Sequence, residues 1–445
     1  MGLTMKRIPY GISDYKTLIN ENYYYVDKTM YLEKLEDVSK TNAYLRPRRF
    51  GKTLFTSMMY YYYDINSIDD FDSLFKDTYV YNNPTPNKNN YYILKFDFSK
   101  MSSNDNSKED IEEKFNKTVI TCINDFLGMY NFDYKINEKE TSAQVLANFI
   151  VYFKSLKLEH KIYIIIDEYD NFTNAILEKN NIELFKSLLG KNGFVKDFYA
   201  TIKSYSGTVI DRTFVTGVCS ISLDSMTSGF NIATNLTTRT NFNAMTSFTH
   251  DEVKELIKDY EDKEIIFKEM LENYDGYCFN KENIELVFNP TLTMYYLNYL
   301  EEEGVKPKEL LDNNIISNYE QIRNIISLGD YKNIIRDIYD NGEIEAQLSV
   351  NLDLNNYTIE RLEKKDIVSL LYYFGYLTID RLGYMGTIFR IPNKVIREVF
   401  DNYFLQILKS VDVKIDNDEA TNGLIEMAKT GKIDKISEVV SDVVD

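Results

Sequence analysis

The first half of the chain alternates between short apolar runs and longer stretches of helical spacing. Runs at 43–45, 91–99 and 162–166 have strand character, and the last is continuously apolar and β-branched. Such a run suits a central strand that is buried on both faces of a parallel sheet. Helical spacing lies between the runs, near 107–130 and 141–158. Strands separated by helices predict a parallel, right-handed α/β sheet.

A fourth strand is predicted at 212–218, after a helical stretch near 182–206. The predicted strands end in polar residues, and in open α/β sheets ligands bind at the carboxyl ends of the strands. Beyond 248 the pattern changes. Thr249 and Glu252 form a predicted capping box that opens a helical region to about 273. A short hairpin is predicted within 274–288, and Pro290 then starts another helix.

The region 310–410 is mostly of helical pattern with one interruption. A helix near 364–374 leads into short strands at 375–379 and 387–393, and a further helix runs to about 409. This order resembles a winged-helix module. Its wing carries only Arg381 and Arg390 as basic residues, so we expect a module that packs or docks against protein rather than one that binds DNA.

Composition narrows the choice of partners. The chain has 445 residues and a net charge of −18, which argues against broad binding to nucleic-acid phosphates. Three scattered cysteines predict neither a disulfide framework nor a zinc site. The chain has two histidines, which argues against a His-based catalytic triad. Neither a secretory signal nor an apolar run of about 18 residues is visible, so a cytoplasmic protein without a membrane span is expected.

The one dense basic stretch follows the first predicted strand and precedes a helical pattern. Strand, basic loop, Gly-Lys-Thr and helix form the layout of a phosphate-binding loop, in which helix-start N–H groups face the phosphates. Lys52 is expected on the β- and γ-phosphates, and the Thr53 hydroxyl on Mg²⁺. The general pattern has glycine where this chain has Arg46. The predicted nucleotide-binding residues are Arg46, Arg48, Arg49, Phe50, Gly51, Lys52, Thr53 and Leu54.

The apolar run 162–166 ends in Asp167 and Glu168, a Walker B arrangement. There Asp167 would hold Mg²⁺ through water, and Glu168 would polarise the attacking water. The alternative is a buried strand with two solvated carboxylates at its end. Thr216, with Ser220, is a candidate sensor of the γ-phosphate, and a plain strand-end turn is its alternative. Arg212 and Arg239 are the remaining candidates for a charge-stabilising arginine, with surface salt bridges as the default.

Several motifs in fixed order resemble the bacterial AAA-ATPase-like family. They are Asp27-Lys28-Thr29, the stretches 46–53 and 166–170, Thr216-Gly217-Val218, and the stretches 221–225 and 228–235. The resemblance covers roughly 5–300 and the wing around 389–393. It implies ATP and Mg²⁺ as ligands, and Arg46 is usual in that family. Taken alone, Asp27-Lys28-Thr29 predicts a capping turn before the helix that follows it. Cys219-Ser220 departs from the family's usual Ser-Pro.

The resemblance predicts an α/β P-loop NTPase sheet flanked by helices, followed by a helical lid and a winged-helix-like α+β module. The family is often fused to a PD-(D/E)XK nuclease-like module, which we do not expect here because the chain ends before any such motif. The predicted parts are an N-terminal cap segment (1–40), the ATPase core (41–248), the lid (249–310), the winged-helix-like domain (311–410) and an acidic helical tail (411–445).

Two functions from different classes follow. The first is Mg²⁺-dependent ATP hydrolysis that drives a conformational switch, with a nucleic-acid-related or defence system as one setting. The second is a nucleotide-binding scaffold that does not hydrolyse, motivated by the altered sensor and the lack of a convincing arginine finger. A small-molecule kinase is a weaker third, because Asp167 and Glu168 end the strand and no basic lid is visible. A protein partner or a second copy could complete the site, since arginine fingers are often supplied in trans.

Overall fold

The computed structural model describes residues 6–99, 101, 107–171, 184, 193–220, 233–282, 285–311, 331–349 and 362–410. The chain divides into two compact units, 1–394 and 395–445. The motifs predicted at 221–225 and 228–232, much of the helical stretch near 182–206 and the tail from 411 lie outside the described residues.

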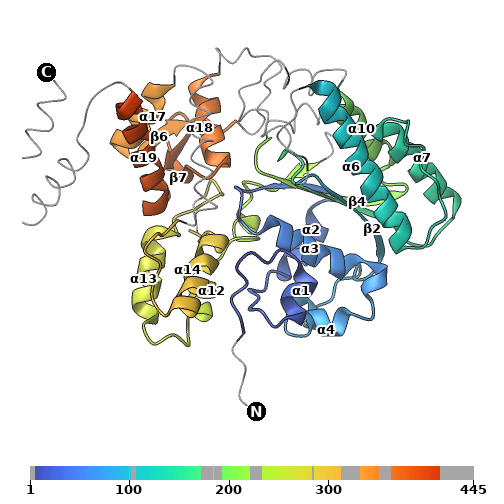
Figure 1. Ribbon diagram of the computed structural model, residues 1–445, viewed down its shortest axis with the longest axis horizontal. Coiled ribbons are helices and arrows are strands. Elements are labelled where there is room, and N and C mark those ends of the chain that lie inside the picture. The colour runs from blue at the N-terminus through green and yellow to red at the C-terminus, as the bar shows by residue number, and fades with distance from the viewer. Residues whose placement is uncertain are drawn as a thin grey trace, which may run out of the picture. The chain divides into compact units, whose positions relative to one another are not determined.

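The N-terminal part is built around a five-stranded sheet in the order β2-β3-β4-β1-β5, and every pair is parallel (Figure 1). This confirms the predicted parallel α/β sheet. The register aligns Leu45 with Gly217 and Asp97 with Asp167, so these strands end at one edge. The strands are β1 (Thr41–Leu45), β2 (Tyr91–Asp97), β3 (Lys161–Asp167), β4 (Ile210–Gly217) and β5 (Thr234–Asn235).

Helices cover both faces of this sheet (Figure 1). One face carries α1 (Tyr15–Asn20), α2 (Met30–Val38), α3 (Lys52–Tyr63) and α4 (Phe71–Phe75). The other carries α6 (Lys108–Met129), α7 (Ser142–Ser155) and α10 (Phe194–Tyr205). Between α3 and the sheet, Tyr62 and Tyr63 pack in an aromatic core, where the Tyr63 ring lies 5.1 Å from that of Tyr163. Burial of these large rings fixes α3, and with it the loop at its start, against the sheet. The short elements η1 (Ile65–Ser67) and α5 (Tyr79–Asn82) follow α3 and α4.

Three helices follow the core: α12 (His250–Leu256), α13 (Lys263–Asn273) and α14 (Pro290–Glu303), after the one-turn η3 (Thr240–Phe242). The capping box of Thr249 and Glu252 is present, and Asn289 caps α14 with Pro290 in its first turn. The predicted helical region is two helices, because α12 ends at Leu256 and Asp262 begins a new N-terminus. The predicted hairpin is reduced to the bridge Tyr277–Val287.

The C-terminal part of the first unit has an antiparallel sheet of order β6-β8-β7. Its elements are α17 (Lys332–Asn341), β6 (Glu343–Ala346), α18 (Lys364–Tyr373), β7 (Thr378–Leu382) and β8 (Thr387–Arg390), and α19 (Lys394–Ser410) follows. Both predicted strands and both predicted helices are present, although β7 begins and ends three residues later than predicted and β8 ends at Arg390, three residues earlier. The third strand, β6, is not predicted by the sequence, because its four residues pair only once β8 lies beside them.

Candidate functional site

The loop after β1 leads directly into α3, as predicted. Gly51 is the N-cap of α3 and has a φ of 72°, and Arg49 has a φ of 68°. Glycine adopts this left-handed conformation at no steric cost, and a Cβ at position 51 would lie 3.1 Å from the Thr246 carbonyl oxygen. The tight turn leaves the free N–H groups of α3 at the sheet edge, which is the geometry of an anion site.

Lys52 is enclosed by the loop that precedes it. Its ammonium donates to the carbonyl oxygens of Arg46 and Pro47, each at 3.1 Å, and lies 3.3 Å from Oε1 of Glu168. Only 3% of the residue is exposed. The structure therefore brings together the predicted phosphate-binding lysine and the predicted base from two different strand ends.

Arg46 occupies a different place from the one predicted. Its guanidinium is buried and donates to the carbonyl oxygens of Leu45, Thr237, Phe242 and Asn243. It also lies 4.3 Å and 4.1 Å from the ring centroids of Tyr44 and Phe279. The structure therefore does not place this arginine at the predicted phosphate position, because its Nη1 and Nη2 atoms donate to interior carbonyl oxygens, whereas its buried Nε has no hydrogen-bond partner within the described residues.

Asp167 is the buried end of β3. Thr216 Oγ1 donates to its Oδ1 at 2.6 Å, and Thr56 Oγ1 lies 3.3 Å from its Oδ2. The candidate sensor and the candidate metal-binding carboxylate are thus in contact. Thr56 is a partner that the sequence analysis missed, and its position one turn after Thr53 on α3 is the signal that could have found it.

Glu168 directly follows β3 with a φ of 53°. This conformation is strained for a residue with a side chain and is held here by the residues that follow. Asp170 accepts the N–H groups of Val218 and Cys219, and the Tyr169 hydroxyl donates to the Cys219 carbonyl oxygen. The ends of β3 and β4 are therefore clamped together, which holds Glu168 in place.

A cavity of about 450 Å³ opens beside the loop. Gly51, Lys52, Thr53 and Glu168 line one part of it, with Arg49 and Leu54. The rest of the wall is mostly apolar and comes from segments that were not predicted to bind a ligand. Its apolar side chains are Ile12, Tyr24, Tyr25 and Val26 before α2, and Met245, Phe248 and Met294 near the later helices. Burial raises the pKa of Tyr25 well above its usual value, so this wall residue presents a neutral phenol.

Lys28 crosses between these two walls. It is buried, and its ammonium lies 2.6 and 2.7 Å from the two carboxylate oxygens of Glu252 in the first turn of α12. Burial lowers the pKa of Lys28, although Glu252 acts in the opposite direction. Asp27 accepts from the N–H and hydroxyl of Thr29, just before α2. The motif therefore makes the predicted turn and also joins the N-terminal segment to α12.

The remaining candidates are not on the cavity wall. The Phe50 ring is buried against Tyr277 and Phe279, and Arg48 is half-buried in the loop. Arg212 pairs with Tyr163 in the sheet, five residues before the end of β4, so its prediction as a site arginine is wrong. Arg239 is exposed at the N-cap of η3. Ser220 is buried.

A comparison with known protein families matches the part of the chain that contains the loop. Residues 9–227 match the family model described as predicted AAA-ATPase. This part of the chain belongs to the AAA-ATPase-like family. The AAA-ATPase-like region contains the loop, Asp167, Glu168 and Thr216, whereas the wall from Met245, Phe248 and Met294 lies beyond it. This family membership supports a P-loop fold that binds a nucleotide.

Curated proteins include no match to the chain. Among solved structures, the chain is similar to the Aeropyrum pernix ORC2 protein, determined as ADPNP–ADP complexes. The identity is 12%, the match covers 88% of this chain and 98% of that chain, and the TM-score is 0.40. Within the described ranges, the helices are too short or too polar to cross a bilayer.

Proposed function

We propose that this AAA-ATPase-like chain binds ATP with Mg²⁺ in the cavity beside the loop and hydrolyses it. One observation carries the proposal: the Lys52 ammonium is held inside the phosphate loop, 3.3 Å from Glu168, on the wall of a cavity of about 450 Å³. That volume falls in the range of small-molecule sites. The family membership supports the nucleotide-binding part of the proposal.

The phosphates would lie over the start of α3. The free N–H groups there and the helix dipole favour an anion, and Lys52 would exchange its two carbonyl partners for phosphate oxygens. The apolar wall of Ile12, Val26 and Met294 would take the base and sugar. Of the predicted loop residues, Arg49, Gly51, Lys52, Thr53 and Leu54 line the cavity and keep their proposed roles.

Mg²⁺ would be held by the Thr53 hydroxyl and, through water, by Asp167. Mg²⁺ prefers one or two protein oxygens plus phosphates and waters, so a large cluster of acidic ligands is not required. The described residues contain no group of three His, Cys, Asp or Glu side chains placed to hold a metal. This donor set is sparse, and a nucleotide-borne Mg²⁺ fits it. When bound, the ion would neutralise charge on the phosphates.

Glu168 is the proposed general base, and its strained backbone aims the carboxylate at the cavity. Thr216 would act by orienting Asp167 through the 2.6 Å hydrogen bond. Hydrolysis would then drive a conformational switch as phosphate contacts form and break. The second candidate is a scaffold that binds without hydrolysis. It is supported by one aspect of the Lys52–Glu168 pair: a carboxylate held by a lysine is not free to polarise an attacking water.

Calorimetric titration of ATP and Mg²⁺ against wild type and Lys52→Ala tests binding. Wild type should bind, and the variant should bind at least about tenfold more weakly because it loses a charge-assisted contact. A wild type without binding refutes the proposal.

A phosphate-release assay then separates the two candidates: Glu168→Gln should bind ATP like wild type and release phosphate about 10²-fold more slowly. If wild type itself releases none, the scaffold is favoured. Formation of ADP without free phosphate would revive the kinase.

A further inference from the structure

The phosphate loop has a second face, turned away from the cavity. There the Phe50 ring lies 5.0 Å from the Tyr277 ring and 5.4 Å from the Phe279 ring, both near-perpendicular. The Arg46 guanidinium lies over the same Phe279 ring. Pro47 packs so closely against Gly375 that a Cβ on that glycine would come within 3.0 Å of the proline ring. Three residues of one short loop therefore contact chain that lies more than two hundred residues later.

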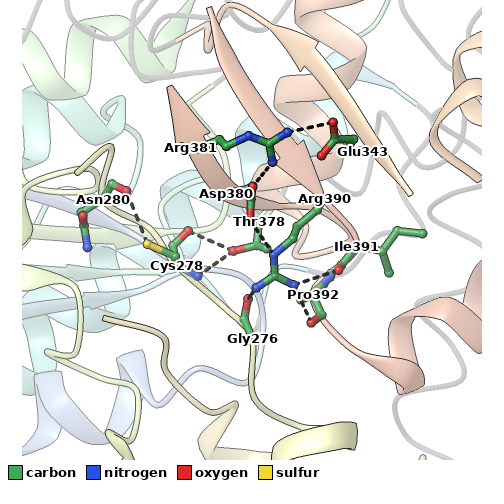
Figure 2. A network of polar contacts seen from close by, with 10 residues as sticks. All are labelled: Gly276, Cys278, Asn280, Glu343, Thr378, Asp380, Arg381, Arg390, Ile391 and Pro392. Atoms are coloured by element: carbon green, nitrogen blue, oxygen red, sulfur yellow. Dashed lines mark hydrogen bonds and ion pairs between the residues drawn. The ribbon is translucent and has the colours of Figure 1, made fainter. Parts of the chain in front are cut away.

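The segment 276–280 is in turn joined to the antiparallel sheet by buried hydrogen bonds (Figure 2). The Cys278 N–H donates to Thr378 Oγ1 at 2.6 Å, and the same hydroxyl donates back to the Cys278 carbonyl oxygen at 3.0 Å. Ile379 N–H donates to that carbonyl oxygen as well. Strand β7 is thereby fixed to the segment that the phosphate loop contacts.

Arg390 closes the connection. Its guanidinium donates to Asp380, to the carbonyl oxygens of Ile391 and Pro392, and across to the Gly276 carbonyl oxygen at 3.1 Å (Figure 2). Gly276 has a φ of 92°, and a Cβ there would lie 2.1 Å from the Pro392 oxygen. Arg390 is thus a structural clamp, and its donors are spent within the protein.

Arg381 offers a contrast on the same sheet. It is half exposed, and within the described part of the chain its guanidinium contacts only Asp380 and Glu343 (Figure 2). Surface ion pairs of this kind contribute little to the free energy of folding. Arg381 therefore serves as the matched control for Arg390.

We propose that segment 276–280 is a joint through which phosphate occupancy of the loop controls the sheet module, meaning β6, β7, β8 and α18, and through which the module tunes nucleotide affinity. The inference rests on the proposed nucleotide site. It names a regulation of that site that runs through the loop itself, from Arg46, Pro47 and Phe50.

Packing explains why the loop would transmit its state. Lys52 is bonded to the carbonyl oxygens of Arg46 and Pro47, so a phosphate that draws Lys52 away changes the contacts of the residues that touch the joint. Close-packed interiors have few voids to absorb such a shift and pass it on to the next element. Linkage then requires the reverse effect: a change at the module end must alter nucleotide affinity by the same free energy.

The test measures Kd for ATPγS and for ADP, both with Mg²⁺, by calorimetry on the full chain. The variants are Arg390→Gln and Thr378→Val, with Arg381→Gln as control. In both joint variants the ratio of the two Kd values should change by about fivefold or more, the lower end of ordinary allosteric coupling. The control should keep the wild-type ratio within about twofold, because Arg390 keeps its bonds to Asp380 and to the Gly276 carbonyl oxygen when Arg381 is replaced.

Hydrogen exchange of wild type removes the dependence on variant folding. Amides of 276–280 and 378–390 should differ in protection between the ATPγS and ADP complexes. Equal protection there, or folded joint variants with wild-type ratios, overturns the joint while leaving nucleotide binding intact. A wild type that binds neither nucleotide overturns both the joint and the proposed function, so the two failures are distinguishable.

Discussion

Replacing Arg46 with glycine, the residue of the general phosphate-loop pattern, separates a phosphate ligand from a structural arginine. In the structure the guanidinium satisfies the main-chain oxygens of Thr237, Phe242 and Asn243, and stacks between two rings. Each buried acceptor that loses its donor costs about 1–3 kcal/mol. Removing the guanidinium also removes the desolvation cost of a buried charge, which offsets part of the free energy lost at the three acceptors. We expect Arg46→Gly to lower the free energy of unfolding by about 3–5 kcal/mol.

The assay is thermal unfolding without nucleotide. For a core of this size, about 2–4 °C of Tm is lost per kcal/mol, so a drop of about 6–20 °C is expected. Arg48→Gly makes the same change in the same loop at a half-buried side chain and should have the smaller effect. Arg46→Met keeps most of the apolar volume and should fall between the two. An Arg46→Gly protein with the wild-type Tm and weakened ATP binding would show that the guanidinium serves phosphate and refute the structural role.

Two further changes test the surroundings of the site. Lys28→Met leaves the partly buried Glu252 without its cation. Breaking a fully buried pair costs about 3–5 kcal/mol, and we expect less here because a quarter of the Glu252 side chain is exposed. In Lys28→Met the Tm should fall and ATP should bind more weakly. Lys254→Met removes an exposed cation from α12, the helix that carries Glu252, and should change neither property. An unaltered Tm in Lys28→Met would contradict a stabilising role of the Lys28–Glu252 pair. Gly217→Ala places a Cβ 2.3 Å from the Tyr169 ring. Overpacking of about 1–3 kcal/mol should follow, with slowed phosphate release because the clamp on Glu168 shifts, and equal stability and turnover of the alanine protein would count against the clamp.

Local patterns were enough for four of the five strands of the parallel sheet and for the order of the site motifs along the chain. Alternating apolar runs and helical spacing predict the parallel sheet, because a strand buried on both faces must be apolar along its length. Asp167 ends β3, Thr216 is the penultimate residue of β4, and the loop that leads to Lys52 begins where β1 ends; parallel strands bring such ends to one edge. The capping box of Thr249 and Glu252 is similarly local, since its hydrogen bonds join residues three apart.

Only the tertiary structure decided what the long side chains do. The sequence places Arg46 in a phosphate loop, yet its guanidinium is claimed by carbonyl oxygens 191 to 197 residues later. The Lys28–Glu252 pair spans 224 residues, and the apolar cavity wall combines residues inside the family-matched region with residues that follow it. A loop's own pattern specifies its backbone turn, because that depends on φ, ψ and neighbouring N–H groups. The partners of a flexible, charged side chain depend on which distant segments fold against it, and no local pattern contains that choice.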